Sequence, residues 1–273
     1  MALVDLHLHL LPGVDDGPPD EAASLVHAER IARAGVREAT VTPHVGHPDY
    51  PLDPATIAER TRALQAVLDA AGLPLRLHPG GEIHPDGATS LDRAALDAVA
   101  HGPRGARWVL LEVPFAGIGP GFLAACRHVR DHGFGLLIAH PERAAGLLPD
   151  GLRRLAPEIA TGALLQVNVC SLLGRHGPAV REAATRLVRD GLAHVLASDG
   201  HGGDRRDTLG AGPGAALRAG ASALRSVHLT EANPRFLLEH GIPPGVEDEL
   251  RAWRSPHEGR VRAAIAAARR VVR

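Results

Sequence analysis

Short apolar runs alternate with longer amphipathic stretches along most of the chain. Seven runs contain β-branched residues, as buried strands do, and they cover residues 4–10, 38–44, 75–83, 108–114, 135–141, 163–169 and 194–198. Three stretches between them place apolar residues every three or four positions and are followed by a glycine, which is typical of helices; they are 21–34, 54–71 and 178–190. This alternation predicts a parallel α/β architecture.

Length helps to choose between two parallel architectures. A chain of 273 residues suits a TIM-like (β/α) barrel better than a doubly wound sheet, and no GxGxxG loop follows the first run. We therefore predict a TIM-like barrel in a single α/β domain, with the doubly wound sheet as the alternative. The glycine- and arginine-rich stretch 204–220 is predicted to be a long loop.

Composition excludes several classes of protein. The 30 basic residues are all arginine and face 31 acidic residues, so the net charge of -1 offers no general attraction for nucleic acid or a membrane surface. Without lysine, the chain cannot use Schiff-base, carbamylated-lysine or P-loop chemistry. Cys126 and Cys170 lack the arginine six residues later that thiol phosphatases require. No leader precedes the first run, which predicts a cytoplasmic protein without membrane insertion.

Residue types that bind metals gather at the carboxyl ends of the predicted strands. His7 and His9 are two residues apart, so both side chains point to the same face of a strand. Because the carboxyl ends of barrel strands form one mouth, we expect side chains from six strands to converge there. These side chains are His7, His9, His44, Glu82, Glu112, His140, Asp199 and His201, with Asp15 and Asp16 in the loop after the first strand.

This set contains too many ligands for one ion. Imidazole and carboxylate together suit manganese, iron or zinc, and a catalytic ion needs about three protein ligands. We therefore predict two to three divalent ions, with Glu82 or Glu112 as a bridge. Most of the other histidines, including His101, fall in helix or loop patterns and are interpreted as structural. His47 and His84 flank ligand positions and are candidates for substrate contact.

Seven short segments follow one another in a recognisable order. They are DLHLHLLPGVDDG (5–17), TPH (42–44), GGEI (80–83), LEVP (111–114), AHPER (139–143), SDGH (198–201) and ANPRFLL (232–238). Between about residues 3 and 242, this set resembles the polymerase-and-histidinol-phosphatase (PHP) superfamily. Within it, the set is similar to the manganese-dependent protein-tyrosine phosphatases of bacterial capsule and exopolysaccharide systems. LLPGVDDG and HPER carry most of the specificity, since many amidohydrolases share HxH.

The resemblance implies a distorted seven-stranded barrel with a trinuclear centre. It implies three ligand groups: His7, His9, Glu82 and Asp199; Glu82, Glu112 and His140; and Asp16, His44 and His201. Asp15 is the alternative to Asp16 in the DD pair.

Two arginines match the phosphate-binding arginines of the same family. They are Arg143 and Arg206, with Arg205 as the neighbour of the second, and a guanidinium group suits phosphoryl oxygens. We count both among the catalytic and substrate-binding residues, together with Asp199 as a catalytic residue and His47 on the substrate side. The loop after His44 lacks the second histidine that commonly follows TPH in the family.

Residues 243–273 lie outside the resemblance. They are predicted to form a C-terminal helical extension, in which Val261, Ile265, Ala268 and Val272 share one face. That face predicts packing on the barrel, with self-association into a homo-oligomer as the alternative.

These features predict a metal-dependent phosphomonoester hydrolase that acts as a protein-tyrosine phosphatase. Hydroxide activated by the metals would attack phosphorus in line, without a covalent phosphoenzyme. The substrate would be a phosphotyrosine protein, such as a bacterial tyrosine kinase. A small-molecule phosphatase of the histidinol-phosphate type is one alternative, and a non-catalytic, metal-stabilised regulatory PHP module is another.

Overall fold

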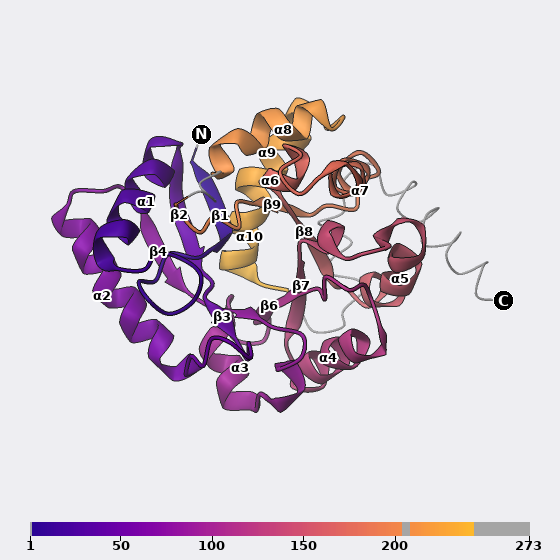
Figure 1. Ribbon diagram of the computed structural model, residues 1–273, viewed down its shortest axis with the longest axis horizontal. Coiled ribbons are helices and arrows are strands. Elements are labelled where there is room, and N and C mark those ends of the chain that lie inside the picture. The colour runs from indigo at the N-terminus through magenta and orange to yellow at the C-terminus, as the bar shows by residue number, and fades with distance from the viewer. Residues whose placement is uncertain (1, 204–207, 243–273) are drawn as a thin grey trace.

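The strands of this protein lie inside a ring of helices (Figure 1). The computed structural model describes residues 2–203 and 208–242. Within these ranges, nine strands pair in parallel in two sheets, ordered β1-β2-β4 and β3-β5-β6-β7-β8-β9. They are β1 (Leu3–Leu8), β2 (Val36–Val41), β3 (His44–Val45), β4 (Arg76–Pro79), β5 (Glu82–Ile83), β6 (Trp108–Glu112), β7 (Gly135–Ala139), β8 (Leu164–Asn168) and β9 (Val195–Ala197). The predicted parallel α/β class is confirmed.

Helices connect the strands and cover their outer side (Figure 1). In the described residues they are α1 (Glu21–Arg33), α2 (Ile57–Ala70), α3 (Arg93–Val99), α4 (Pro120–Asp131), α5 (Leu152–Ala160), α6 (Val169–Leu172), α7 (Pro178–Arg189), α8 (Gly212–Arg218), α9 (Ala223–Val227) and α10 (Asn233–His240). The three helices predicted from periodicity correspond to α1, α2 and α7. The Asp20 side chain caps α1 by accepting a hydrogen bond from the N–H of Ala23. None of the described helices is long and apolar enough to cross a membrane.

Two of the predicted strand runs are interrupted in the structure. Thr42 and Pro43 separate β2 from β3, and Gly80 and Gly81 separate β4 from β5. Each half then pairs in a different sheet, since β2 pairs with β4 and β3 with β5. The backbone N–H of Glu82 donates to the carbonyl of Pro43 across this interruption (3.0 Å). Seven predicted runs therefore contain nine short strands.

The two sheets also approach each other where β1 passes beside β9. The backbone N–H of His9 donates to the carbonyl of Gly200, and that of Asp199 donates to the carbonyl of His7, both at 2.9 Å. In the described residues, however, the hydrogen-bonded strand pairing does not continue from one sheet into the other. The closed seven-stranded barrel therefore stays a prediction.

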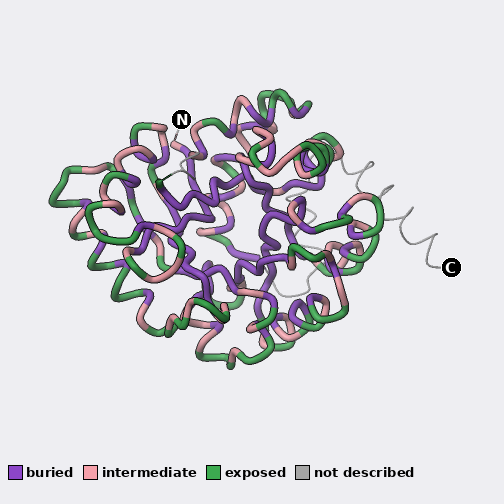
Figure 2. The backbone as a smooth tube through the Cα atoms, viewed as in Figure 1, coloured by how far each residue is buried: buried purple, intermediate pink, exposed green. Residues whose placement is uncertain are grey.

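Apolar side chains fill the space on both sides of the strands, which are buried along most of their length (Figure 2). This burial explains why strands such as β6 and β7 are mostly apolar rather than alternating. The smaller of two clusters includes Trp108 and Leu237. The indole N–H of Trp108 donates to the carbonyl of Leu237 in α10 (2.9 Å). Because Trp108 begins β6, α10 packs near the amino ends of the strands.

The loop predicted over 204–220 is partly wrong. Helix α8 lies within that stretch, preceded by a 3-10 turn at Leu209–Ala211. Pro213 suits the first turn of α8, while Ala215 and Ala216 are buried, so packing overrides the low helix propensity of the flanking glycines. The predicted C-terminal extension, 243–273, lies outside the described residues.

Candidate metal centre

The structure brings eight of the nine predicted metal ligands together at the carboxyl ends of the strands. They form two groups, and within each group one ligand atom per residue lies within 4.8 Å of the others. One group consists of His9, Asp16, His44 and His201, and the other of His7, Glu82, His140 and Asp199.

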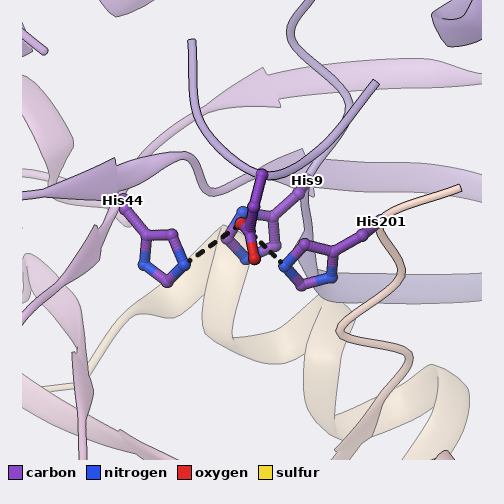
Figure 3. A group of neighbouring side chains, drawn as sticks. His9, His44 and His201 are labelled. Carbon is purple, nitrogen blue, oxygen red and sulfur yellow. Dashed lines mark ion pairs between the residues drawn. The ribbon is translucent and has the colours of Figure 1, made fainter. Parts of the chain in front are cut away.

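The first group surrounds the carboxylate of Asp16. His44 and His201 approach the same oxygen, Oδ1, with Nε2 at 3.4 and 3.2 Å. In Figure 3 the His9 ring lies between those of His44 and His201, and the dashed lines mark the ion pairs that His44 and His201 form with Asp16. The rings of His9 and His201 stack at 3.9 Å between centroids. The Asp16 side chain is 31% exposed, so this group opens towards solvent.

Asp15 lies behind this group rather than in it. Its carboxylate accepts hydrogen bonds from Nδ1 of His9 (2.7 Å) and from the backbone N–H groups of Gly17 and His44. A carboxylate in this position fixes the imidazole so that Nε2 points to the centre. Of the two aspartates left open by the sequence, the structure therefore brings Asp16 into the group.

Glu82 belongs to the second group and also contacts two histidines of the first group. Its Oε1 is 2.9 Å from Nε2 of His140, and its Oε2 is 3.2 Å from Nε2 of His7. The same Oε2 is 3.4 Å from Nε2 of His9 and 3.3 Å from Nδ1 of His44. The carboxyl group is almost completely buried. One carboxylate thus faces four imidazoles, the arrangement expected of a bridging ligand.

Glu112 lies near this cluster without joining either group. Its Oε1 is 4.0 Å from Nε2 of His140. Burial, and then the charges of Glu82 and Asp199, raise the pKa of Glu112 to about 9. Glu112 is the one predicted ligand that the structure leaves at the edge of the site.

The donor set fits divalent metal ions. The two groups contain five imidazoles and three carboxylates, a mixture that suits manganese, iron and zinc. Nε2 of His7 and Nε2 of His9 lie 3.3 Å apart and both face carboxylate oxygens. Although burial opposes the charged form, Glu82 and Asp199 raise the pKa of His7 to about 9. The carboxylates of the site therefore favour a positive charge beside them, which a bound metal ion would supply.

Two of the ligand positions have an unusual backbone. His140 has φ 31° and Asp199 has φ 51°, and no other non-glycine residue in the described ranges has a positive φ. His140 directly follows strand β7, and Asp199 lies two residues after the end of strand β9. Strained residues of this kind cluster at functional sites.

A cavity of about 340 Å³ lies over the two groups. The predicted substrate residues Arg143 and His47 both line it, as do Tyr50, His84 and Phe115. Nη1 of Arg143 is 3.1 Å from Oδ2 of Asp199, and its guanidinium group lies 4.3 Å from the centre of the Phe115 ring. The predicted Arg206 lies outside the described residues.

Tyr50 and Phe115 are functional candidates that sequence reasoning missed. The Tyr50 ring is stacked on His44, and Phe115 is 49% exposed. A signal existed, because aromatic residues are only 3% of the chain and both lie in loops just beyond predicted ligands. His84, which the sequence also offered as a candidate for substrate contact, lines the cavity too.

Fold and site together define an α/β protein with a histidine–carboxylate centre at the carboxyl ends of its parallel strands. The sequence profile of the CpsB/CapC capsular polysaccharide synthesis family matches residues 3–229. The chain belongs to this family, which confirms the resemblance noted from the motifs.

Two relatives named as tyrosine phosphatases share much of the chain. The tyrosine-protein phosphatase YwqE of Bacillus subtilis is 31% identical over 201 residues, which are 73% of this chain and 77% of YwqE. The putative tyrosine-protein phosphatase CapC of Staphylococcus aureus is 29% identical over 199 residues, with the same two coverages.

Solved structures also resemble this one. A structure from work on YwqE of Bacillus subtilis and CpsB of Streptococcus pneumoniae, described as unique metal-dependent tyrosine phosphatases, superimposes with a TM-score of 0.73. That match is 28% identical and covers 90% of this chain and all of the other. The phosphotriesterase homology protein of Escherichia coli has a TM-score of 0.56 at 13% identity, over 85% of this chain and 97% of its own, and shares the fold.

Proposed function

We propose that this protein is a metal-dependent protein-tyrosine phosphatase. The observation that carries the proposal is Glu82, which faces four imidazoles at the base of a cavity whose wall bears Arg143. The proposal is supported by membership of the CpsB/CapC family and by relatives named as tyrosine phosphatases.

The residues that would hold the ions follow the two groups. His9, Asp16, His44 and His201 are proposed for one ion, and His7, Glu82, His140 and Asp199 for the others, with Glu112 completing the set. We propose that the centre binds three divalent ions and that manganese is the preferred metal. When bound, such ions supply Lewis acidity and activate water for in-line displacement at phosphorus.

Arg143 would bind the phosphoryl group. Its guanidinium group has donors free for two parallel hydrogen bonds to phosphoryl oxygens, a geometry that lysine does not offer. Asp199 orients this side chain through the contact at 3.1 Å. We retain Arg206 as the second phosphate-binding arginine and His47 as a substrate contact.

Phe115 would bind the phenyl ring of the substrate. Its ring is half exposed beside the Arg143 guanidinium group, so a phosphate held by Arg143 brings its ester substituent next to an aromatic face. Tyr50 and His47 would form the opposite wall, since their rings lie 4.6 Å apart over His44.

Several finer features belong to the same proposal. The two sheets would form a distorted seven-stranded barrel of the PHP type, with β2–β3 and β4–β5 as interrupted strands. Residues 1–273 would make one domain.

The substrate would be a phosphotyrosine protein, such as a tyrosine kinase. The protein would act in the cytoplasm, where Cys126 and Cys170 would stay reduced as free thiols.

The test is phosphate release from two substrates by the full-length chain. The manganese-loaded protein should hydrolyse a phosphotyrosine peptide faster than histidinol phosphate, lose activity in EDTA and regain it when manganese is restored. Full activity after EDTA treatment would contradict the metal centre. A preference for histidinol phosphate would contradict the proposed substrate and favour the small-molecule phosphatase. Full metal occupancy without turnover on any phosphoester would favour the regulatory module.

A further inference from the structure

Strand β8 carries two amide side chains that reach ligands from three other strands. Gln166 and Asn168 are two residues apart, so they share a face of the strand, and both are completely buried. Neither residue belongs to the two groups of proposed metal ligands. We propose that this pair is a directional hydrogen-bond relay that positions His7 and Asp199 for metal binding.

The direction of the relay is set by a backbone group. The N–H of His140 can only donate, and it lies 3.3 Å from Oε1 of Gln166. The carbonyl oxygen of the amide must therefore face His140, because the reverse orientation would oppose two donors. The same Oε1 is 3.1 Å from Nδ1 of His7. Nδ1 of His7 must accordingly carry the hydrogen.

This assignment determines which nitrogen of His7 is available. With Nδ1 donating to Gln166, the lone pair of the neutral ring lies on Nε2. Nε2 is the atom that faces Glu82 at 3.2 Å and Asp199 at 3.3 Å. A metal-binding histidine usually has its other nitrogen held in this way by a buried acceptor.

The relay continues from Gln166 to Asp199. Nε2 of Gln166 donates to Oδ1 of Asn168 (2.7 Å), so the amide nitrogen of Asn168 points the other way and donates to Oδ2 of Asp199 (2.7 Å). Arg143 also donates to Oδ2. Both donors occupy one carboxylate oxygen, which leaves Oδ1 of Asp199 facing His7 and His9.

The backbone holds the second amide in place. The N–H of Asn168 donates to Oε1 of the buried Glu142 (2.8 Å). Because both amides are fully buried, water does not replace their hydrogen bonds. A single chain of hydrogen bonds thus runs from the backbone N–H of His140, just after β7, through β8 to ligands on β1 and after β9.

The test measures metal binding rather than turnover. The proposal rests on the proposed function only in taking His7 and Asp199 as metal ligands. In Gln166→Met a side chain of similar size loses both the acceptor and the donor, so zinc affinity should fall by about 10- to 100-fold in a chelator-competition titration. Asn168→Leu loses the donor to Asp199 and the acceptor for Gln166 but leaves the contact between Gln166 and His7, so it should lower zinc affinity by a smaller factor.

Gln65 provides the matched control. Its Oε1 accepts from the N–H of Leu77 (2.7 Å) and its Nε2 donates to the carbonyl of Leu75 (3.1 Å), so it joins α2 to β4 as Gln166 joins β7 to β8. Gln65→Met should reduce the unfolding temperature in EDTA but leave zinc affinity unchanged. A structural role alone would affect stability in both variants and zinc affinity in neither.

A spectroscopic measurement provides a second readout. In the zinc-loaded wild-type protein, nitrogen-15 spectra of histidine should report His7 protonated at Nδ1 and metal-bound at Nε2. Wild-type zinc affinity in both Gln166→Met and Asn168→Leu, or a proton on Nε2 of His7, would overturn the relay and leave the metal centre standing. Failure of the wild-type chain to bind zinc or manganese would overturn the centre and with it the proposed function.

Discussion

Strand β6 has a buried histidine next to an aromatic ring at each end. At its start, the ring of His101 packs on Trp108 with 4.6 Å between centroids. Beyond its other end, Phe115 lies 6.0 Å from the ring of His140. Each histidine also has one buried ring nitrogen without a hydrogen-bond partner. His101 and His140 are therefore alike in being buried and in having one unpaired ring nitrogen.

What differs is the group that faces Nε2. For His140 it is the carboxylate of Glu82 at 2.9 Å. For His101 it is Gly80, since a Cβ built there would lie 2.1 Å from the ring. Burial lowers the pKa of both histidines, and for His101 it does so to about 3. A buried, unpaired histidine is therefore not a sign of a metal site unless carboxylates surround it.

The largest effect should come from removing the central carboxylate. Glu82→Gln should lower phosphatase activity by more than about 100-fold. Replacing a residue that only hydrogen-bonds to a metal ligand already lowers metal affinity or activity by about 10- to 100-fold, and Glu82 itself faces four imidazoles. Glu38 is the control at the other end, where it pairs with His78 at 3.2 Å. Glu38→Gln should keep activity and metal content. An equal loss of activity in Glu82→Gln and Glu38→Gln would contradict the distinction between the carboxyl and amino ends of the strands.

A smaller effect is expected from the exposed aromatic ring. Phe115→Ala should raise KM for a phosphotyrosine peptide by about 3- to 10-fold, the range that an aromatic contact provides, with little change in kcat. KM for a phosphate ester without an aromatic ring should change little. Phe236, which stacks on His240 in α10, is the control and should leave both constants unchanged when replaced by alanine. An equal rise in KM for both esters would argue against Phe115 as a ring contact.

The smallest effect concerns the pH dependence of stability at His101. Its pKa is about 3 in the folded chain and near 6.5 when unfolded, because burial, then His78 and Arg107, disfavour the cation. The unfolded state therefore binds the proton first, and folding free energy is lost as pH falls below 6.5. Between pH 6.5 and 5 the loss should be about 2 kcal/mol by linkage.

This loss can be isolated with His101→Phe. The variant keeps an aromatic ring beside Trp108 but has no proton to bind. Urea unfolding in EDTA should give a wild-type stability that falls more steeply with acid than that of the variant. Identical pH slopes would mean that His101 is protonated in the folded chain as well.

Much of the centre could be predicted from the sequence because the strands are local features. An apolar run ending in histidine or a carboxylate identifies a strand end, and parallel strands bring such ends together, so the convergence of His7, Glu82 and Asp199 follows. Phe115 could not be placed, because the path of a loop depends on what it packs against. The separate pairing of β2 and β3 was also hidden, since an apolar run does not record its partners.

The same limit applies to the amides of β8. Gln166 and Asn168 lie in a run that periodicity identifies only as a buried strand, and a polar residue there has no local signature of its partner. Their contacts with His7 and Asp199 arise from residues that are 159 and 31 positions away in the chain. Helix α8 was missed for a related reason, because burial outweighed glycine content.

The left-handed backbone at His140 and Asp199 bears on how this protein could be engineered. Each such residue costs on the order of 1–3 kcal/mol, which glycine would largely recover. A search for thermostable variants would therefore favour glycine at both positions and would remove two proposed ligands. With His140 and Asp199 as metal ligands, these two positions would exchange stability for activity.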